Sequence, residues 1–200
     1  MKLIDLTQSL SAETAPYPGD KPVDIETLSE GGYNISNISA CLHTGTHCDF
    51  PVHAGLEGGA ELFTADRMIL PCALIDCGGK MIPGDIFDDV YVRTEALLIR
   101  TGHCEKAGKP EYFTDFPSFT EQAVKRVINR RIKILALDTP SLSTNSEDDF
   151  RFHRGLLSAG ITIVEGLVNT HRLPKNFMLM TFPLKITDSD GAPARVAAWV

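Results

Sequence analysis

The stretch HTGTHCDFPVH, residues 43–53, concentrates side chains that could bind a metal ion. Three of the six histidines of the chain, His43, His47 and His53, lie in it, and Asp49 stands between the second and the third. Imidazole nitrogens and carboxylate oxygens are common protein ligands of zinc, manganese and iron. An ion held by three such groups keeps a position open for water, which it makes acidic enough to act as a nucleophile near neutral pH. The stretch therefore predicts a catalytic metal site, with His53 as a further ligand or as a proton shuttle.

The spacing also predicts the shape of the backbone. In a straight strand, the Cα atoms of His43 and His47 would lie ~13 Å apart, at ~3.3 Å per residue. Two ligands of one ion must converge, because metal–nitrogen bonds are only ~2.0–2.1 Å long. Gly45 is the residue at which the chain bends most easily. We therefore expect a bent strand end or a loop here, with Cys48 at the wrong parity for the metal and buried.

Two simpler explanations compete with a catalytic metal site. Ordinary loop hydrogen bonds would explain a lone histidine, but they explain poorly three histidines and an aspartate at odd positions around a glycine. Structural zinc sites are usually rich in thiolates. The five cysteines of the chain show no C-x-x-C spacing, which argues against such a site.

The overall composition is that of an ordinary globular protein. The 200 residues are 43% hydrophobic and 22% charged, and we expect residues 1–200 to form one domain. The net charge of −7 argues against a nucleic-acid or anionic-membrane partner. No apolar run reaches the length of a membrane span. The odd number of cysteines and the absence of an apolar signal segment at the N-terminus favour a cytoplasmic location.

The elements that must position these side chains form a mixed α/β pattern. A helix is expected over 116–131, begun by a capping box of Ser118 and Glu121, and a shorter helix over 151–160, ended by Gly160. No G-x-G-x-x-G follows a strand, which argues against a doubly wound nucleotide-binding fold. Two strands are expected around Gly31 and Gly32, a helical turn at 83–88, and further strands at 2–10, 68–77, 95–102, 132–141, 161–169, 177–186 and 193–200.

Two residues later in the chain are candidates for the same site. Glu165 lies in the apolar segment TIVEGL, and buried carboxylates are rare unless they are paired or bound to a metal. With Asp49 it would supply the bridging carboxylates that a two-metal site needs. A strand-end glutamate that reaches solvent, and an exposed His153 at a helix start, are the alternatives. We expect His103 and His171 to be surface or loop residues.

Several segments together resemble the metal-dependent cyclase-like hydrolases, whose best-known members are the bacterial kynurenine formamidases. HTGTHCDFPVH matches the HxGTHxDxPxH motif of that family. Further segments with such a likeness run from about residue 3 to residue 199, and they include LDTPS (137–141), HRGLLSAGITIVEGLVN (153–169) and FPLKITDSDGAPARVAAW (182–199). The resemblance implies a swivelling β/β/α fold. It also implies a homodimer or homotetramer in which the partner chain helps to wall the site.

The resemblance implies a metal-binding role for five side chains. His43, His47 and Asp49 would bind a first ion, and Asp49 would bridge to a second. His153 would bind that second ion, and Glu165 would contact both. Zinc, as two ions, is the first expectation, and manganese is the alternative.

The reaction that the resemblance implies is the hydrolysis of a carbon–nitrogen amide bond. In the arylformamidase reaction of tryptophan catabolism, a metal-bound hydroxide would attack the carbonyl of N-formylkynurenine, a small aromatic amide. His53 would act as general acid/base and give a proton to the leaving nitrogen, so that kynurenine and formate form. The segment YPGD places Tyr17 where the formamidases have a tryptophan against the substrate. Tyrosine can still stack on a ring, but the change leaves the identity of the substrate open.

Other functions remain open for this scaffold. The resemblance also covers isatin-type hydrolases and other hydrolases or cyclases that act on cyclic amides or lactones. A function of another class is a metal-containing protein that binds a small molecule without turnover. The presence of both His53 and Glu165 argues against that alternative.

Overall fold

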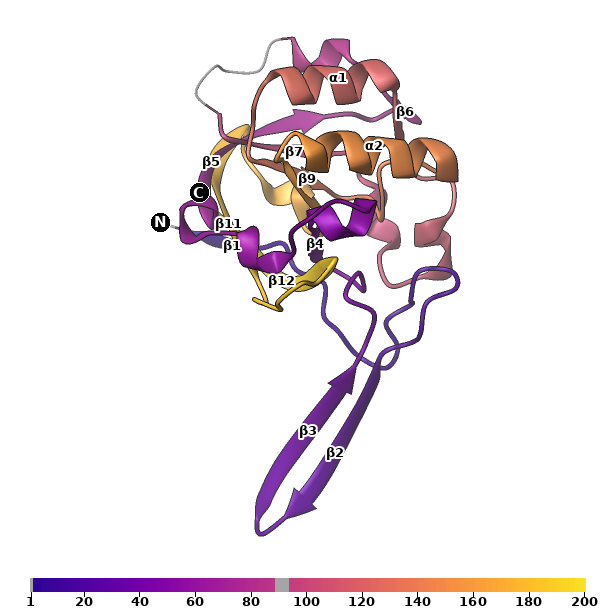
Figure 1. Ribbon diagram of the computed structural model, residues 1–200, viewed down its shortest axis with the longest axis vertical. Helices are drawn as coiled ribbons and strands as arrows, with labels where there is room; N and C mark the ends of the chain where they lie inside the picture. Colours follow the sequence, from indigo (N-terminus) through magenta and orange to yellow (C-terminus); the bar gives the residue numbers. More distant parts are fainter. Residues whose placement is uncertain (1, 89–93) are drawn as a thin grey trace.

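A curved eight-stranded sheet is the main element of the protein, seen in a computed structural model that describes residues 2–88 and 94–200 (Figure 1). The predicted mixed α/β class is confirmed, while the assignment of residues 1–200 to one domain stays a prediction. In spatial order the strands are β1 (Leu3–Asp5), β12 (Gly191–Trp199), β11 (Asn176–Pro183), β5 (Ile69–Asp76), β7 (Ala96–Arg100), β9 (Ile134–Leu137), β10 (Thr162–Glu165) and β4 (His47–Asp49).

The sheet curls until its two ends meet. Strand β4 pairs antiparallel with β10 on one side and with β12 on the other, so that Asp49 lies opposite both Ile163 and Gly191. Strands β5, β7, β9 and β10 run parallel, and β7 and β9 are apolar on both faces. Continuous apolar runs such as LLI (97–99) are typical of strands that are covered on both sides. One core therefore fills the interior of the barrel-like sheet, and a second core lies outside it.

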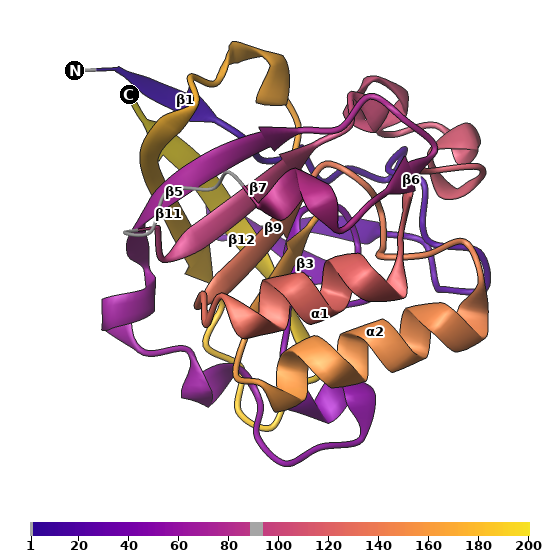
Figure 2. The same cartoon turned by 90° about the horizontal axis from the view of Figure 1, so that it is seen from above.

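Two helices cover the outer side of the parallel strands (Figures 1 and 2). Helix α1 (Glu121–Asn129) buries Ala123, Val124 and Val127, the apolar stripe that its sequence predicts. Helix α2 (Ser146–Ser158) packs beside α1 and against β10. No helix in the described ranges is long and apolar enough to cross a membrane.

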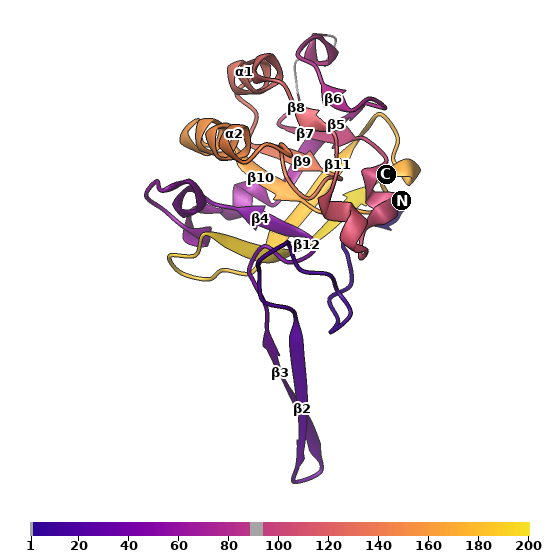
Figure 3. The ribbon, with the colours of Figure 1, turned by 90° about the vertical axis from the view of Figure 1, so that its right-hand side faces the viewer.

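The remaining elements are small. Strands β6 (Met81–Ile82) and β8 (Ser118–Phe119) form a parallel pair. Strands β2 (Asp24–Glu30) and β3 (Tyr33–Ser39) form a hairpin that projects far from the rest of the molecule (Figures 1 and 3). Short 3-10 helices occupy Pro51–Ala54, Ala60–Leu62, Ala65–Arg67, Asp85–Phe87, His103–Lys106, Pro110–Phe113 and Thr170–Arg172.

Several predicted boundaries are wrong, and three of the differences have a clear physical reason. The N-terminal strand ends at Asp5 rather than residue 10, because the chain then leaves the sheet and the Gln8 amide donates to the Thr46 hydroxyl. The second helix begins at Ser146 rather than residue 151, since the Asn145 side chain caps it. The capping box is also wrong, because Ser118 belongs to β8 and Thr120 caps α1.

The cap of α1 can be tested by Thr120→Ala, in which the Ala123 amide loses the hydroxyl oxygen that accepts its hydrogen bond at 3.1 Å. We expect the free energy of unfolding to fall by about 1 kcal/mol in urea titrations. Thr120→Ser keeps the oxygen and is the matched control, with an expected change of less than about 0.5 kcal/mol. Equal stability of the alanine and wild-type proteins would contradict the assignment of Thr120 as the cap.

Candidate metal centre and active site

The segment of residues 43–53 bends at Gly45, as the spacing of His43 and His47 predicts. Gly45 has a φ of +71°, and the ring centroids of His43 and His47 lie 4.9 Å apart. His47 and Asp49 then enter β4, where both are buried. Pro51 begins a 3-10 helix that carries His53 back over the same centre, so that the rings of His53 and His43 lie 4.3 Å apart.

Strand pairing and helix packing bring the two distant candidates to this segment. Glu165 lies directly opposite His47 in the β4–β10 ladder, and paired residues project on the same side of a sheet. His153 is in the middle of α2, which packs on β10, and its side chain is buried. The alternative of an exposed His153 at a helix start is therefore wrong, and so is that of a Glu165 that reaches solvent.

The nitrogen and oxygen atoms of these five residues converge. His43 Nδ1 and His47 Nε2 lie 2.8 and 3.3 Å from Asp49 Oδ1, while His153 Nε2 lies 3.5 Å from Asp49 Oδ2. The Nε2 atoms of His47 and His153 lie 3.6 and 3.3 Å from the Glu165 carboxylate. Two groups of side chains whose ligand atoms lie within 4.8 Å of one another share Asp49: His43, Asp49 and His53 form one, and His47, Asp49 and Glu165 form the other. A pair of ions bridged by a carboxylate needs such a shared residue.

Backbone carbonyls fix which nitrogen of two rings faces the centre. His47 Nδ1 donates to the Gly45 carbonyl at 3.0 Å, and His153 Nδ1 donates to the Asp149 carbonyl at 2.8 Å. A carbonyl can only accept, so both Nδ1 atoms carry the hydrogen. In the neutral rings, each Nε2 then directs a lone pair at the carboxylates. Metal-binding histidines are usually oriented by such a hydrogen bond on the far nitrogen.

The buried carboxylates at the centre lack the hydrogen-bond partners that buried oxygen atoms normally have. Both oxygens of Asp49 and Oε1 of Glu165 are buried without a hydrogen bond, although imidazole nitrogens lie near them. Lone pairs on nitrogen and oxygen that face one another repel unless a proton or a cation lies between them. The donor set of imidazoles and carboxylates suits a divalent zinc or manganese ion. The residues present therefore fit a metal centre.

The pKa values of the two carboxyl groups diverge. Burial opposes the ionisation of Asp49, but its contacts with His47, His153 and His43 outweigh this and hold its pKa well below the usual 3.8. Burial and the neighbouring Asp49 charge raise the pKa of Glu165 from 4.5 to about 7. Two buried carboxyl groups this close do not readily ionise together, because their negative charges repel each other. A bound cation offsets that repulsion.

His43 differs from the other rings because carboxylates face both of its nitrogens. Its Nε2 lies 3.2 Å from Oδ2 of Asp190, on the side away from Asp49. Burial lowers the pKa of His43, but Asp49 and Asp190 outweigh it and raise this pKa from 6.5 to about 9. Asp190 is a site residue that the motif analysis missed. The signal was present in the segment DGAPAR, where Asp190 comes directly before β12.

Two glycines permit the close approach of these segments. A Cβ atom on Gly191 would lie 2.7 Å from Cε1 of His43, so that only glycine leaves room for the ring. A Cβ on Gly166, whose φ is +71°, would lie 2.3 Å from the Gly45 carbonyl oxygen. Both contacts link residues far apart in sequence, so the sequence does not show that positions 166 and 191 require glycine.

Asp149 organises one wall of the site. Its Oδ1 accepts from the Ser141 hydroxyl and from the Leu142 and Ser143 amides, at 2.7, 3.2 and 2.8 Å. Its backbone carbonyl orients His153, as described above. Asp149 thus links the LDTPS segment (137–141) to His153.

The centre forms the floor of a cavity of about 350 Å³. His53 lines this cavity, and its ring lies 5.3 Å from that of His153. Partial burial lowers the pKa of His53 below 6.5, although the Asp49 charge acts in the opposite direction. Tyr17, Tyr112 and Phe113 form an aromatic wall, with the rings of Tyr17 and Phe113 packed edge to face at 5.5 Å.

The remaining histidines lie outside the centre. His171 is exposed, as expected. His103 is buried, so it is not a surface histidine, although it lies in the connection between β7 and β8, as the alternative of a loop residue predicts. Its Nε2 donates to the Tyr112 carbonyl at 2.8 Å, and its ring stacks on that of Tyr112. His103 thus supports the aromatic wall from behind.

The chain resembles known proteins in sequence and in fold. The chain is 28% identical over 200 residues to the kynurenine formamidase of Bacillus mycoides (strain KBAB4), a match that covers 96% of this chain and 94% of that protein. Among solved structures, a predicted metal-dependent hydrolase from Bacillus stearothermophilus is 26% identical, with a TM-score of 0.83 and coverage of 98% and 97% of the two chains.

An isatin hydrolase bound to the product analogue thioisatinate has the same fold, with a TM-score of 0.88, 22% identity, and coverage of 100% of this chain and 92% of that one. The model of the Cyclase family, described as "Putative cyclase", matches residues 4–144, which is more than half of the chain. The chain therefore belongs to the cyclase family.

Proposed function

We propose that this protein is a metal-dependent hydrolase of carbon–nitrogen amide bonds, of the arylformamidase type. One observation carries the proposal: the Nε2 lone pairs of His47 and His153 are fixed toward two buried carboxylates at the floor of a cavity that His53 also lines. The near full-length likeness to kynurenine formamidases supports the choice of reaction.

The proposed ligands are His43, His47 and Asp49 for one ion and His153 for the other, with Asp49 and Glu165 between them. Two zinc ions are the first choice, and manganese is the alternative, because both accept nitrogen and carboxylate ligands. When bound, such ions acidify water and polarise a carbonyl oxygen.

The protein side chains have three tasks in this reaction. The aromatic wall holds the aryl ring of the substrate, so that its amide lies over the floor of the cavity. His53 takes up and returns the proton that must reach the leaving nitrogen as the carbon–nitrogen bond breaks. Asp190 keeps the His43 ring in place through its far nitrogen. N-formylkynurenine would yield kynurenine and formate.

We also propose a cytoplasmic homodimer or homotetramer. The odd number of cysteines, all of them free, supports the location. A cyclic amide such as isatin is the second candidate substrate, since Tyr17 replaces the tryptophan that faces the substrate in the formamidases. Parallel assays with N-formylkynurenine and isatin distinguish the two activities. No hydrolysis of any amide, lactam or lactone with zinc, manganese or cobalt would instead favour a metal-containing binding protein.

Removal of metal tests the centre itself. Protein treated with a chelator should regain zinc or manganese in stoichiometric amounts, measured by elemental analysis. At a free ion concentration of 100 times Kd, the ion should stabilise the fold by about 2.7 kcal/mol, equivalent to roughly 5–10 °C in Tm. His47→Ala should lose both effects, while His171→Ala, at an exposed histidine, should keep them. A chelated protein that binds no divalent ion would exclude the metal centre.

His53→Gln tests the proton-transfer role. With the acid/base group removed, kcat for an aryl formamide should fall by about 10²–10⁴-fold. Because all five proposed ligands remain, the metal content should match that of the wild-type protein. If metal content falls together with kcat, His53 is a ligand and not the proton shuttle.

Tyr17→Ala tests the aromatic wall. The variant removes a ring that packs on Phe113, so the substrate ring should lose a contact worth about 1 kcal/mol. We expect KM for N-formylkynurenine to rise about fivefold with little change in kcat, as steady-state kinetics would show. Tyr17→Phe keeps the ring and should retain the wild-type KM. An alanine variant with unchanged KM would place the substrate ring elsewhere in the cavity.

A further inference from the structure

The segment that follows β1 brings a polar side chain to the catalytic cavity. The chain leaves the sheet after Asp5, and Gln8 lines the cavity whose floor the candidate metal centre forms. The backbone amide of Gln8 donates to the Thr46 hydroxyl at 2.9 Å, and its side-chain Nε2 donates to the Gly166 carbonyl at 2.7 Å. Gln8 is therefore held in place at both its backbone and its side chain, although it lies outside the strands.

Both hydrogen-bond partners of Gln8 belong to segments that carry proposed metal ligands. Thr46 directly precedes His47. Gly166 directly follows Glu165. The Thr46 hydroxyl also donates to the Gly166 carbonyl at 2.7 Å, so that one hydrogen-bonded unit connects the two segments with Gln8. This unit fixes the position of the Gln8 side chain relative to the proposed ligands.

The hydrogen bond to Gly166 also determines which atom of the Gln8 amide remains free. A carbonyl oxygen only accepts, so the NH₂ group must face Gly166 and Oε1 must lie on the other side of the planar amide. Oε1 has no hydrogen-bond partner among the residues that the structure describes, 2–88 and 94–200. It is also not one of the buried polar atoms, so it is accessible. Because the Gln8 side chain lines the cavity, a ligand bound there can reach this acceptor.

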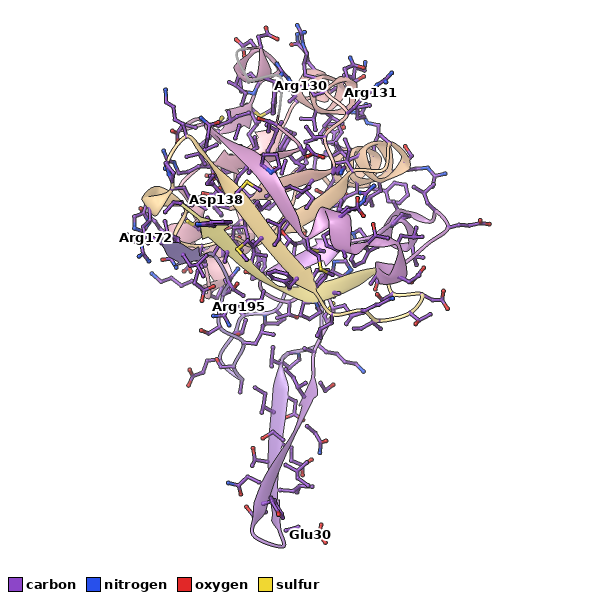
Figure 4. The ribbon with its side chains drawn as sticks, turned by 90° about the vertical axis from the view of Figure 1, so that its left-hand side faces the viewer. Glu30, Arg130, Arg131, Asp138, Arg172 and Arg195 are labelled. Carbon is purple, nitrogen blue, oxygen red and sulfur yellow. The ribbon has the colours of Figure 1, made fainter. Side chains whose placement is uncertain are left out.

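Most of the other polar groups of the cavity already have a partner. The Ser141 hydroxyl donates to Asp149 at 2.7 Å. The Tyr112 hydroxyl donates at 3.3 Å to the carbonyl of Asp138, a residue that follows β9 and is labelled in Figure 4. The imidazoles and carboxylates of the floor belong to the proposed metal centre. Gln8 Oε1 thus remains as an uncharged acceptor, and such a group suits a neutral N–H that leaves water when a ligand binds.

We propose that Gln8 Oε1 accepts a hydrogen bond from the N–H of the substrate amide, so that the site selects secondary amides and lactams over esters and lactones. This inference rests on the hydrolase function proposed above. N-formylkynurenine and isatin both carry such an N–H on an aromatic ring. A site that hydrogen-bonds a substrate N–H discriminates against analogues that lack it, because its own acceptor is then left without a partner.

The same hydrogen bond would assist the reaction. Water adds to the carbonyl carbon, the carbon–nitrogen bond breaks, and its electron pair stays on the nitrogen. His53 gives that nitrogen the proton that it took from the water. Protonation makes the remaining N–H a stronger donor, so the hydrogen bond to Gln8 Oε1 is stronger in the transition state than in the bound substrate.

A pair of isosteric substrates tests this contact. Formanilide has an N–H between its ring and its formyl group, and phenyl formate has an oxygen atom in that place. Gln8→Leu keeps a side chain of similar size but has no acceptor. In this variant, the ratio of kcat/KM for formanilide to kcat/KM for phenyl formate should fall about tenfold. A general loss of activity cancels in the ratio, so a merely structural role of Gln8 would leave the ratio unchanged.

Thr46→Val is the matched control. It removes a hydrogen bond of the same length, 2.7 Å, to the same Gly166 carbonyl, but it leaves the Gln8 side chain present. The substrate ratio of this variant should stay within about twofold of the wild-type ratio. A ratio that falls equally in Gln8→Leu and Thr46→Val, or that falls in neither, overturns the proposal.

Binding of two inert ligands tests the same contact without catalysis. Indole and benzofuran have the same two-ring shape, but indole has an N–H where benzofuran has an oxygen, and neither can be hydrolysed. Titration calorimetry should show that the wild-type protein binds indole about fivefold more tightly than benzofuran, and that Gln8→Leu abolishes the difference. Equal affinities in the wild-type protein, or no binding of either ligand, overturn the proposal. If the preference for indole is found but no amide is hydrolysed, the role of Gln8 stands and the hydrolase function fails.

Discussion

Two carboxylates buried side by side are the constraint on which the rest of the site depends. Asp49 and Glu165 are only 1% and 3% exposed, and three of their oxygens accept no hydrogen bond. Buried charge of one sign is costly unless a proton or a cation balances it. In their neutral forms, His47 and His153 do not supply the missing hydrogen bonds, because they hold their hydrogens on the nitrogens that face backbone carbonyls. A divalent cation resolves all of these conflicts together.

The curled sheet is what makes such a cluster possible. Strand β4 has only three residues, yet its pairing with both β10 and β12 places Asp49 where the two ends of the sheet meet. From β10 comes Glu165, and Asp190 precedes β12. The glycines at 166 and 191 allow backbone and ring to approach more closely than any side chain would permit. A rigid sheet therefore sets the positions of the ligand atoms, as precise coordination requires.

The same architecture leaves surfaces uncovered. Two helices are enough to cover the parallel half of the sheet, but the antiparallel half, with β1, β11 and β12, has its outer side open. The hairpin of β2 and β3 is the reverse case, since all residues of both strands are exposed and no layer covers them. A fold built from layers normally buries each apolar face against another element.

The sequence by itself determined the chemistry of the site and most of its elements. The types and spacing of His43, His47 and Asp49 predict convergence around a bend at Gly45, and Glu165 in an apolar strand predicts a buried carboxylate. These are local properties, because ligand chemistry and backbone freedom belong to the residues themselves. The apolar runs likewise predict the parallel strands and the stripe of α1 to within a few residues.

Only the tertiary structure decided which distant groups meet and which histidines are buried. His153 and His103 are both buried, one against the carboxylates and one beneath the aromatic wall, although their local sequences differ little from those of exposed histidines. The contact of Asp190 with His43 spans 147 residues, and the pairing of Ser118 with β6 displaced the expected helix cap to Thr120. Such outcomes depend on strand pairing and packing between remote segments. The residue pattern of one segment does not specify which remote segment will pack beside it.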